Sequence, residues 1–450
     1  MILSRENRLP EFTFIFITLI ASVLTLMLFS VHFSSIYLSL LIFFIIALFL
    51  INNKIGFFLL LLVRPLLDIF TGDTLLQIGH LSLNVSSVLA VSAIAVTALA
   101  FFKHRADKQT LPFKKSWWLF LVITFLSILY SFNHFSSLAE WIRLLSFYAL
   151  FLLSFLVIKN RADFLELLAV VAYSAIIPSF FAIFQLLTNT GMTLPLEGIS
   201  NRIYGTFAHP NPFAYYLVFL ILILGYLIII KNKNLFFNLS VSALYAILLL
   251  LTFTRGAWIA LVLAIFIVGG LKYRKMLVLF AVLLFLVYLS AEPIRMRVDA
   301  LYTYNPGSSI EWRKGIWNDG MNIAKEKILL GHGAGTSEEI LLAARGPKSG
   351  SSDPHNDYLK IFIENGLIGV VAYVILILTL LYNLAKNYRF ARDTQQKDLY
   401  LFLLAFSTVI FTMSFIDNIL RSTVLQWSFW AIMAGTFALN SISKTSHIKK

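Results

Sequence analysis

The sequence contains no cysteine and few charged residues. The absence of cysteine over 450 residues excludes disulfides, thiolate catalysis and cysteine-ligated metals. Charged residues make up 13% of the chain, whereas a soluble domain carries about 25%. Carboxylates and histidines do not cluster at the spacing of metal ligands, so we expect neither a metal nor another cofactor.

The sequence is instead rich in long apolar blocks. Hydrophobic residues make up 59% of the chain and gather in blocks of about 15–25 residues. Such blocks suit helices of ~20 residues that cross a bilayer, whereas strands of a membrane barrel alternate in polarity. We therefore predict an all-α, polytopic transmembrane helical bundle. The expected segments are 12–30, 36–51, 55–67, 85–102, 116–132, 138–158, 164–188, 210–230, 236–253, 257–270, 276–291, 359–385, 398–415 and 424–441.

The number of spans and their orientation follow from charge. Segment 55–67 is short and contains Arg64 and Pro65, so it is either a span or a re-entrant turn, and the prediction is 12–14 spans. With the N-terminus in the cytoplasm, the inside loops hold 22 Lys and Arg, and the short outside loops hold three. This asymmetry predicts two cytoplasmic termini. It also explains the net charge of +14 without a nucleic-acid partner.

One large loop interrupts the spans. It covers residues 292–358, which the charge pattern places outside the cytoplasm. The predicted organisation is an N-terminal transmembrane bundle (1–291), this extracytoplasmic loop and C-terminal transmembrane helices (359–450), all within one integrated domain. Capping-box patterns at 308–311 and 336–339 predict short helices inside the loop.

Two arginines are candidates for binding an anion. Arg255 lies in TFTRGAW (252–258), in a short turn between apolar segments, where the alternative is an arginine that snorkels to the lipid headgroups. Arg313 lies in EWRKGIW (311–317), where the alternative is a solvated helix face. A guanidinium is always charged, and its planar fork matches phosphate oxygens. Trp312 and Trp317 beside Arg313 suit a membrane interface or sugar stacking.

His355, in PHNDYL (354–359), is the candidate for proton transfer. The alternative is an ordinary loop histidine, but an imidazole can accept a proton near neutral pH. Asn356 and Asp357 are expected to cap the following helix. The glycines of GHGAGT (331–336) are explained by tight turns better than by a phosphate loop, and AHPNPF (208–213) by prolines at a helix start. The residues expected to line the site are Asn356, His332, Gly333, His209, Asn211, Trp312 and Trp317.

The chain resembles the O-antigen ligase and O-antigen polymerase superfamily. The resemblance is carried by TRGAW (254–258), EWRKGIW (311–317), GHGAGT (331–336) and PHNDYLKIFIENGLIG (354–369), and by a large outer loop in the C-terminal half. It implies a metal-independent, inverting glycosyltransferase of the bacterial cytoplasmic (inner) membrane, with its active site on the outer face. The donor would be an undecaprenyl-pyrophosphate-linked glycan. Arg255 and Arg313 would bind its pyrophosphate, and His355 would be the general base on the acceptor hydroxyl.

Three functional hypotheses remain open. A ligase would transfer the glycan to lipid A-core, another surface lipid or a protein, whereas a polymerase would extend another lipid-linked repeat unit. Fourteen segments exceed the twelve associated with the ligases and match some of the polymerases. A transporter without chemistry is the third hypothesis, but the sequence has no internal repeat, and its notable polar residues fall at the outer face.

The topology can be tested directly. Reporter fusions at Lys108 and Gly350 should report the cytoplasm and the outside respectively, because the Lys and Arg asymmetry fixes the parity of the spans. The fusions are compared in intact cells at matched expression. If both positions report the same side, the orientation is wrong.

Overall fold

The computed structural model describes residues 47–49, 51–72, 74–78, 81–103, 112–194, 199–231, 234–290, 292–299, 309–346 and 352–448. The expected segment 12–30 and most of 36–51 lie outside these residues, so the first two predicted spans stay predictions.

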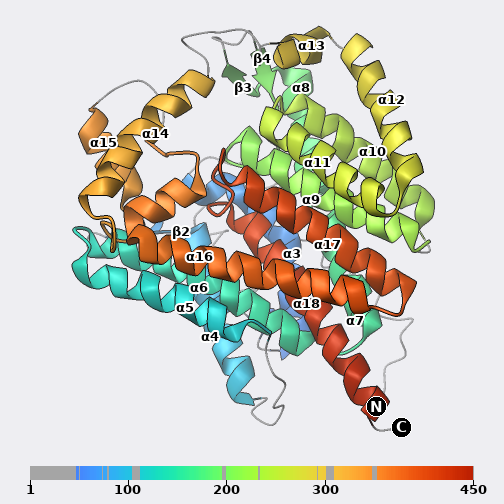
Figure 1. Ribbon diagram of the computed structural model, residues 1–450, viewed down its shortest axis with the longest axis horizontal. Coiled ribbons are helices and arrows are strands. Elements are labelled where there is room, and N and C mark those ends of the chain that lie inside the picture. The colour runs from blue at the N-terminus through green and yellow to red at the C-terminus, as the bar shows by residue number, and fades with distance from the viewer. Residues whose placement is uncertain are drawn as a thin grey trace.

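The described chain is almost entirely helical (Figure 1), which confirms the all-α class. The transmembrane-type helices are α3 (Asn53–Val63), α4 (Val85–Lys103), α5 (Lys114–Leu126), α6 (His134–Val157), α7 (Arg161–Tyr173), α8 (Ile176–Thr188), α9 (Pro210–Ile229), α10 (Leu235–Leu251), α11 (Arg255–Leu271), α12 (Arg274–Ser290), α16 (Asp357–Phe390), α17 (Thr394–Met413) and α18 (Thr423–Ile448). The shorter ones are η2 (Arg64–Gly72), η3 (Ser127–Tyr130), α13 (Glu292–Asp299), α14 (Ser309–Glu326) and α15 (Ser337–Arg345).

Strands are a minor feature. Within the described ranges they form two antiparallel hairpins, β1 (Thr74–Ile78) with β2 (Leu81–Asn84), and β3 (Met192–Leu194) with β4 (Ile199–Arg202). Each hairpin lies in a connection that the charge count places outside. In the second hairpin, Met192 pairs with Arg202. This pairing fixes the beginning of the segment that leads from β4 into α9.

The expected apolar segments from 55–67 onward all coincide with helices. Within the described residues, six helical spans are long and apolar enough to cross a membrane, and α12 with α13 would make a seventh. Helices α10 and α11 are apolar but shorter. The protein is therefore a polytopic helical membrane protein, and the total of 12–14 spans stays a prediction.

The segment 55–67 runs from the start of α7 to the start of α18, and its choice between a span and a re-entrant turn stays open. At its start, the ammonium of Lys54 lies 2.5 Å from the carboxylates of both Asp163 and Glu166, near the start of α7. At its other end, Arg64 lies beside the start of α18, where its guanidinium donates to Thr423 Oγ1 over 2.5 Å. Pro65 lacks a backbone N–H, which accounts for the change from α-helix to 3₁₀-helix there.

The connections sort to two ends of the bundle as the charge count predicts. At one end, ion pairs join loops expected inside, such as Lys272 with Asp398. The other end, called the loop end here, carries α14, α15 and the starts of α4, α6, α9, α11, α16 and α18 (Figure 1). The grouping agrees with the expected alternation among the described helices, and the topology and the identity of the outer side stay predictions.

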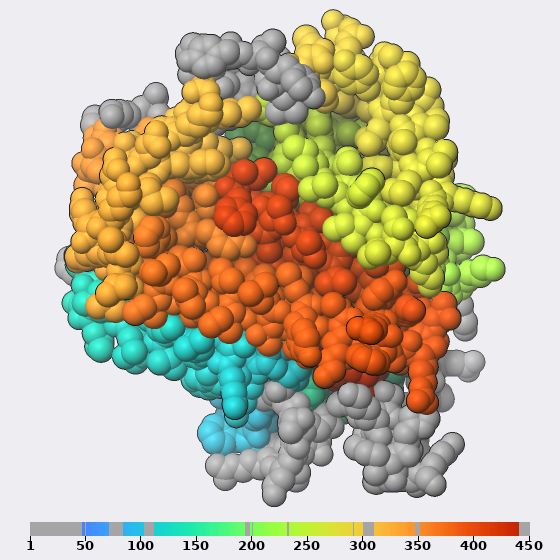
Figure 2. Space-filling model, in the orientation of Figure 1, coloured from blue at the N-terminus to red at the C-terminus, as the bar shows by residue number. Residues whose placement is uncertain are grey.

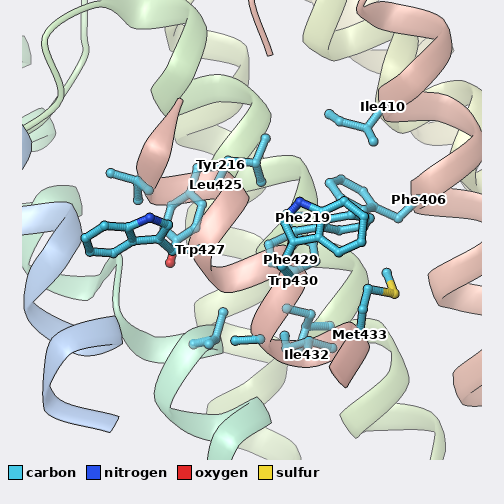
Figure 3. Close-up of a cluster of buried hydrophobic side chains, with 14 of the residues drawn as sticks. Tyr216, Phe219, Phe406, Ile410, Leu425, Trp427, Phe429, Trp430, Ile432 and Met433 are labelled. Atoms are coloured by element: carbon cyan, nitrogen blue, oxygen red, sulfur yellow. The ribbon is translucent and has the colours of Figure 1, made fainter. Parts of the chain in front are cut away.

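An aromatic core holds the long helices together. Helix α9 is buried over most of its length, and its Phe219 packs 4.6 Å from Phe406 of α17, measured between ring centroids (Figure 3). Trp430 of α18 contacts Trp117 of α5 at 4.6 Å and Phe429 at 5.1 Å. Figure 2 shows α16 and α17 covering one face of this core between α5 and α11. Each such pair contributes about 0.5–1.5 kcal/mol beyond area burial.

The glycine-rich segment 331–336 docks onto a break in α16. Gly331, Gly333 and Gly335 all have positive φ angles, which confirms the tight-turn explanation. Gly366, inside α16, has φ 62°, and a Cβ there would lie 2.2 Å from the carbonyl oxygen of Leu329. The freed backbone groups are used across the contact, because the Gly333 N–H donates to the Glu364 carbonyl over 2.8 Å. This contact fixes the loop to the membrane helices.

The two predicted caps that can be compared differ in outcome. The Asn356 side chain accepts from the Leu359 N–H over 3.0 Å, which confirms the cap of α16. The Thr336 prediction is wrong as a capping box, because its hydroxyl donates to the Gly333 carbonyl instead. The Glu339 carboxylate does not complete the capping box either, because it accepts a hydrogen bond from the Ser136 hydroxyl. Both side chains serve the glycine turn and its contact with α6.

Gly366→Ala should destabilise the protein. The left-handed backbone and the clash with the Leu329 carbonyl should cost about 1–3 kcal/mol. The matched control is Gly270→Ala, because a Cβ at Gly270 in α11 meets nothing within 4 Å and alanine favours a helix. Thermal unfolding of the two purified variants in detergent should separate them. Equal melting temperatures for the two variants would show that Gly366→Ala introduces no backbone strain.

Candidate functional site

A polar cavity of about 800 Å³ lies at the loop end. Its wall is built by η2, by the first turns of α4, α6, α9 and α16, by α15 and by the connection from α17 to α18. Helix starts present unpaired N–H groups and a partial positive charge, so several of them converging on one space make it suited to polar or anionic ligands.

His355 lies on this wall and is held in one position. Its backbone adopts φ 46°, and its N–H donates to Asp353 Oδ1 over 3.1 Å. The imidazole Nδ1 lies 3.3 Å from Asp417 Oδ1, and its ring meets Trp312 edge to face at 5.5 Å. About a fifth of the side chain is exposed (21%), so the ring is positioned yet can reach a ligand.

Asp417 is the functional residue that sequence reasoning missed. It lies between α17 and α18, 62 positions from His355, and is 6% exposed. Its Oδ2 accepts from Asn211 Nδ2 over 2.9 Å, and its Oδ1 also accepts from the Asn418 N–H. Burial opposes its ionisation, but the hydrogen bond with His355 and the charge of Arg313 hold the pKa of this carboxyl below its usual value. The only signal was the polar run IDN (416–418) between two apolar blocks.

The protonation of the His355 ring follows from its neighbours. An ionised carboxylate can only accept, so the contact with Asp417 requires Nδ1 to carry the proton. The Asn418 amide lies at 3.4 Å from the same nitrogen, a longer contact with an uncharged group. Because Asp417 fixes Nδ1 as the donor, the neutral ring has its lone pair on Nε2, the atom that a base uses.

Four arginines form a basic cluster near this pair. Arg255 opens α11, Arg313 lies in α14, and neither is on the cavity wall. The charge of Arg313 acts on Arg255, Arg202 and Arg297. Burial, followed by the charges of Arg313 and Arg255, lowers the pKa of the Arg202 guanidinium to about 10, although Asp417 opposes this shift. Arg202 therefore stays charged at neutral pH, and the cluster suits an anion with several oxygens.

Most charges on the cavity wall are paired. Glu140 contacts Arg143 over 2.5 Å, and Arg64 lies 3.2 Å from Asp68. Across the cavity, Arg421 joins the carboxylates of Asp353 and Glu338. Glu339 accepts from Asn133 and Ser136 and meets no cation among the described residues, so carboxylates outnumber cations on the wall, in contrast to the arginine cluster.

Some polar atoms on the wall still lack partners. They belong to Arg64 (Nε and Nη1), Tyr215 (Oη) and Asn418 (Oδ1), counting only partners among the described residues. Buried polar groups are normally satisfied by protein, water or ligand. These atoms favour a ligand that both donates and accepts hydrogen bonds, as sugar hydroxyls do.

The other predicted site residues divide into two groups. His209 and Asn211 line the cavity, and His209 caps α9 by accepting from the Asn211 N–H over 3.1 Å. Burial, with the nearby charge of Arg202, lowers the pKa of His209 to about 4, so this ring is neutral at pH 7. His332 and Gly333 lie outside the cavity wall. His332 Nε2 lies 3.1 Å from the Ile323 carbonyl, which makes it part of the docked turn.

Two further predictions concern the loop tryptophans and metals. Trp317 donates its indole N–H to the Pro354 carbonyl over 2.7 Å, and so fixes the backbone before His355. Trp312 packs on the His355 ring itself. Among the residues that the structure describes, no group of three or more His, Asp or Glu could hold a metal ion.

The fold and the site define a class of protein. A polytopic membrane protein that holds a histidine–carboxylate pair beside an arginine cluster has the parts of an acid–base enzyme with an anionic substrate. Residues 240–374 match a family model described as O-antigen ligase. The match spans α10 to α16 and includes Arg255, Arg313 and His355, and it confirms the resemblance seen in the motifs. Over these residues the chain is similar to the O-antigen ligase family, and the whole chain is a polytopic helical membrane protein. A comparison with curated proteins finds no match.

Proposed function

We propose that this protein transfers a glycan from an undecaprenyl-pyrophosphate carrier to an acceptor hydroxyl at the outer face of the bacterial cytoplasmic membrane. The observation that carries the proposal is the His355–Asp417 pair, which lies between a charge-paired cavity and an arginine cluster. The cluster suits the pyrophosphate of the donor, and the cavity suits a sugar that presents a hydroxyl to His355.

The reaction balances with these groups alone. His355 Nε2 accepts the proton of the acceptor hydroxyl while the hydroxyl oxygen bonds to the anomeric carbon of the donor sugar. The bond from that carbon to the pyrophosphate oxygen breaks, and the leaving group keeps the electron pair. Arg255 and Arg313 stabilise the negative charge that grows on it. Attack from the face opposite the leaving group inverts the anomeric configuration, and the arginines take the role that a divalent metal has elsewhere.

The other hypotheses are weighed by the same geometry. Ligase and polymerase share every group described above and differ only in the acceptor, so the acceptor decides between them. A transporter needs no buried carboxylate to fix the tautomer of a histidine. Transfer of labelled glycan to a product that contains the acceptor, measured in membranes of the source organism, separates an enzyme from a transporter.

His355 and the two arginines should fail in different ways. A general base contributes about 10²–10⁴ in rate, so His355→Ala should bind donor normally but turn over very slowly. Losing a charge-assisted hydrogen bond costs about 1.5–3 kcal/mol, so Arg255→Ala or Arg313→Ala should weaken donor binding and slow transfer together. Lysine at either site should restore function only in part, because it keeps the charge but loses the planar fork.

These variants are compared in membranes with matched protein levels. Binding of undecaprenyl pyrophosphate and glycan transfer are measured side by side. If the three residues were only surface positions, substitution would change free energies by about 0.5 kcal/mol or less, and transfer would be near normal. Full transfer by His355→Ala would remove the proposed base and the mechanism with it.

Asp417→Asn should slow transfer without weakening donor binding. An asparagine amide can donate to Nδ1 and so favour the tautomer that cannot act as base. Residues that orient a functional histidine typically contribute about 10–100-fold. The matched control is Asp319→Asn, which alters a half-exposed carboxylate in α14 that pairs with Arg345. Equal transfer rates for the two variants would show that Asp417 does not orient His355.

A further inference from the structure

Arg202 occupies a buried position between the two halves of the site. It ends β4, is 5% exposed, and has no role in the motifs that identified the site. Its guanidinium makes three hydrogen bonds. Nε donates to the Thr252 carbonyl over 2.9 Å, and Nη2 donates to Asn211 Oδ1 and to Thr254 Oγ1, each over 3.1 Å.

One of these bonds continues to His355. Arg202 donates to Asn211 Oδ1, Asn211 Nδ2 donates to Asp417 Oδ2, and Asp417 Oδ1 faces Nδ1 of His355. A guanidinium only donates and an ionised carboxylate only accepts, so the Asn211 amide between them has a single allowed orientation. The chain of bonds therefore has a fixed direction, which begins at Arg202 and ends by requiring a proton on Nδ1.

The other two bonds reach the arginine cluster. Thr252 and Thr254 form the turn that leads into α11, and Arg255 is its first helical residue. Thr254 makes no side-chain cap bond to the helix, and Arg202 holds this turn from outside together with Arg297, whose Nε donates to the Phe253 carbonyl over 3.3 Å. The same guanidinium thus fixes the backbone beside Arg255 and the carboxylate beside His355.

We propose that Arg202 is a positioning residue that acts through Asn211 and Asp417 to set the tautomer of His355 and, through Thr252 and Thr254, to place Arg255. The proposal rests on the proposed function, in which His355 is the base and Arg255 binds the donor. It assigns no contact with substrate to Arg202.

An arginine is required by the geometry. Three acceptors on two segments, the turn before α11 and the start of α9, are met by one planar group, whereas the single ammonium of lysine is a point donor that cannot span them. The local fold carries this group into place. Gln185 accepts from the N–H groups of Tyr204 and Gly205, each over 2.9 Å, and so anchors the turn that follows β4.

The test is the kinetics of Arg202→Met and Arg202→Lys in proteoliposomes, with the organism's own lipid-linked donor and acceptor. We expect Arg202→Met to lower kcat about 10–100-fold, as loss of an orienting partner does, and Arg202→Lys to recover part of it. Arg161→Met, which changes an exposed arginine at the opposite end of the bundle, is the matched control and should behave as wild type.

A double-mutant cycle separates positioning from general damage. If Arg202 acts on His355 through Asp417, Arg202→Met should reduce kcat by a smaller factor in the Asp417→Asn background than in the wild type, because only its effect through Arg255 remains there. Equal reductions in both backgrounds would overturn the proposal, as would wild-type kcat in Arg202→Met. If the Arg202→Met protein does not accumulate, the isosteric Asn211→Asp tests the same series of hydrogen bonds. The new carboxylate at position 211 faces Asp417 and cannot donate a hydrogen bond to it. Wild-type kcat in that variant would equally overturn it.

The failure of this proposal differs from the failure of the proposed function. Full transfer by His355→Ala removes the base itself. Slow His355→Ala with an unaffected Arg202→Met leaves the base in place and removes only the role of Arg202.

Discussion

The need to satisfy polar groups that are buried where membrane helices end shapes the whole site. Asp417 lies beside the aromatic core, and a carboxylate there is tolerable only with donors on both oxygens. It obtains them from Asn211 at the start of α9 and from His355 before α16. Three helix ends are thereby tied to one carboxylate. The placement of the base and the closure of the helix bundle are consequences of the same hydrogen bonds.

The parts of this arrangement that depend on local sequence could be predicted. Helices follow from apolar runs, and Asn356 caps α16 because an Asn before such a run satisfies its first N–H groups. Arg255, Arg313 and His355 stood out because charge is rare in this chain. The predicted roles of His332 and Gly333 in the site were not borne out by their position, since both are used in docking the turn onto α16.

Residues whose role depends on distant partners could not be predicted. Asp417 meets Asn211 across 206 positions, and Arg202 meets Thr252 across 50, through a bundle whose packing no local pattern encodes. In the sequence each reads as a single charge in a short connection. The paired charges of the cavity wall were recognisable only where both partners share one turn of helix, as in Glu140 and Arg143.

The separation of charge across the site has a chemical consequence. A pyrophosphate competes for any uncommitted cation nearby, so a hydroxyl-binding space beside it must have its own arginines neutralised. Arg64, Arg143 and Arg421 are each closed by a carboxylate, whereas the charge of Arg313 meets further arginines. In the proposed function, this arrangement would direct the anion to one side of His355 and the sugar to the other. Asp417 would keep the histidine between them in the tautomer that can take a proton, so the electrostatics that sort the two proposed substrates would also define the direction of transfer.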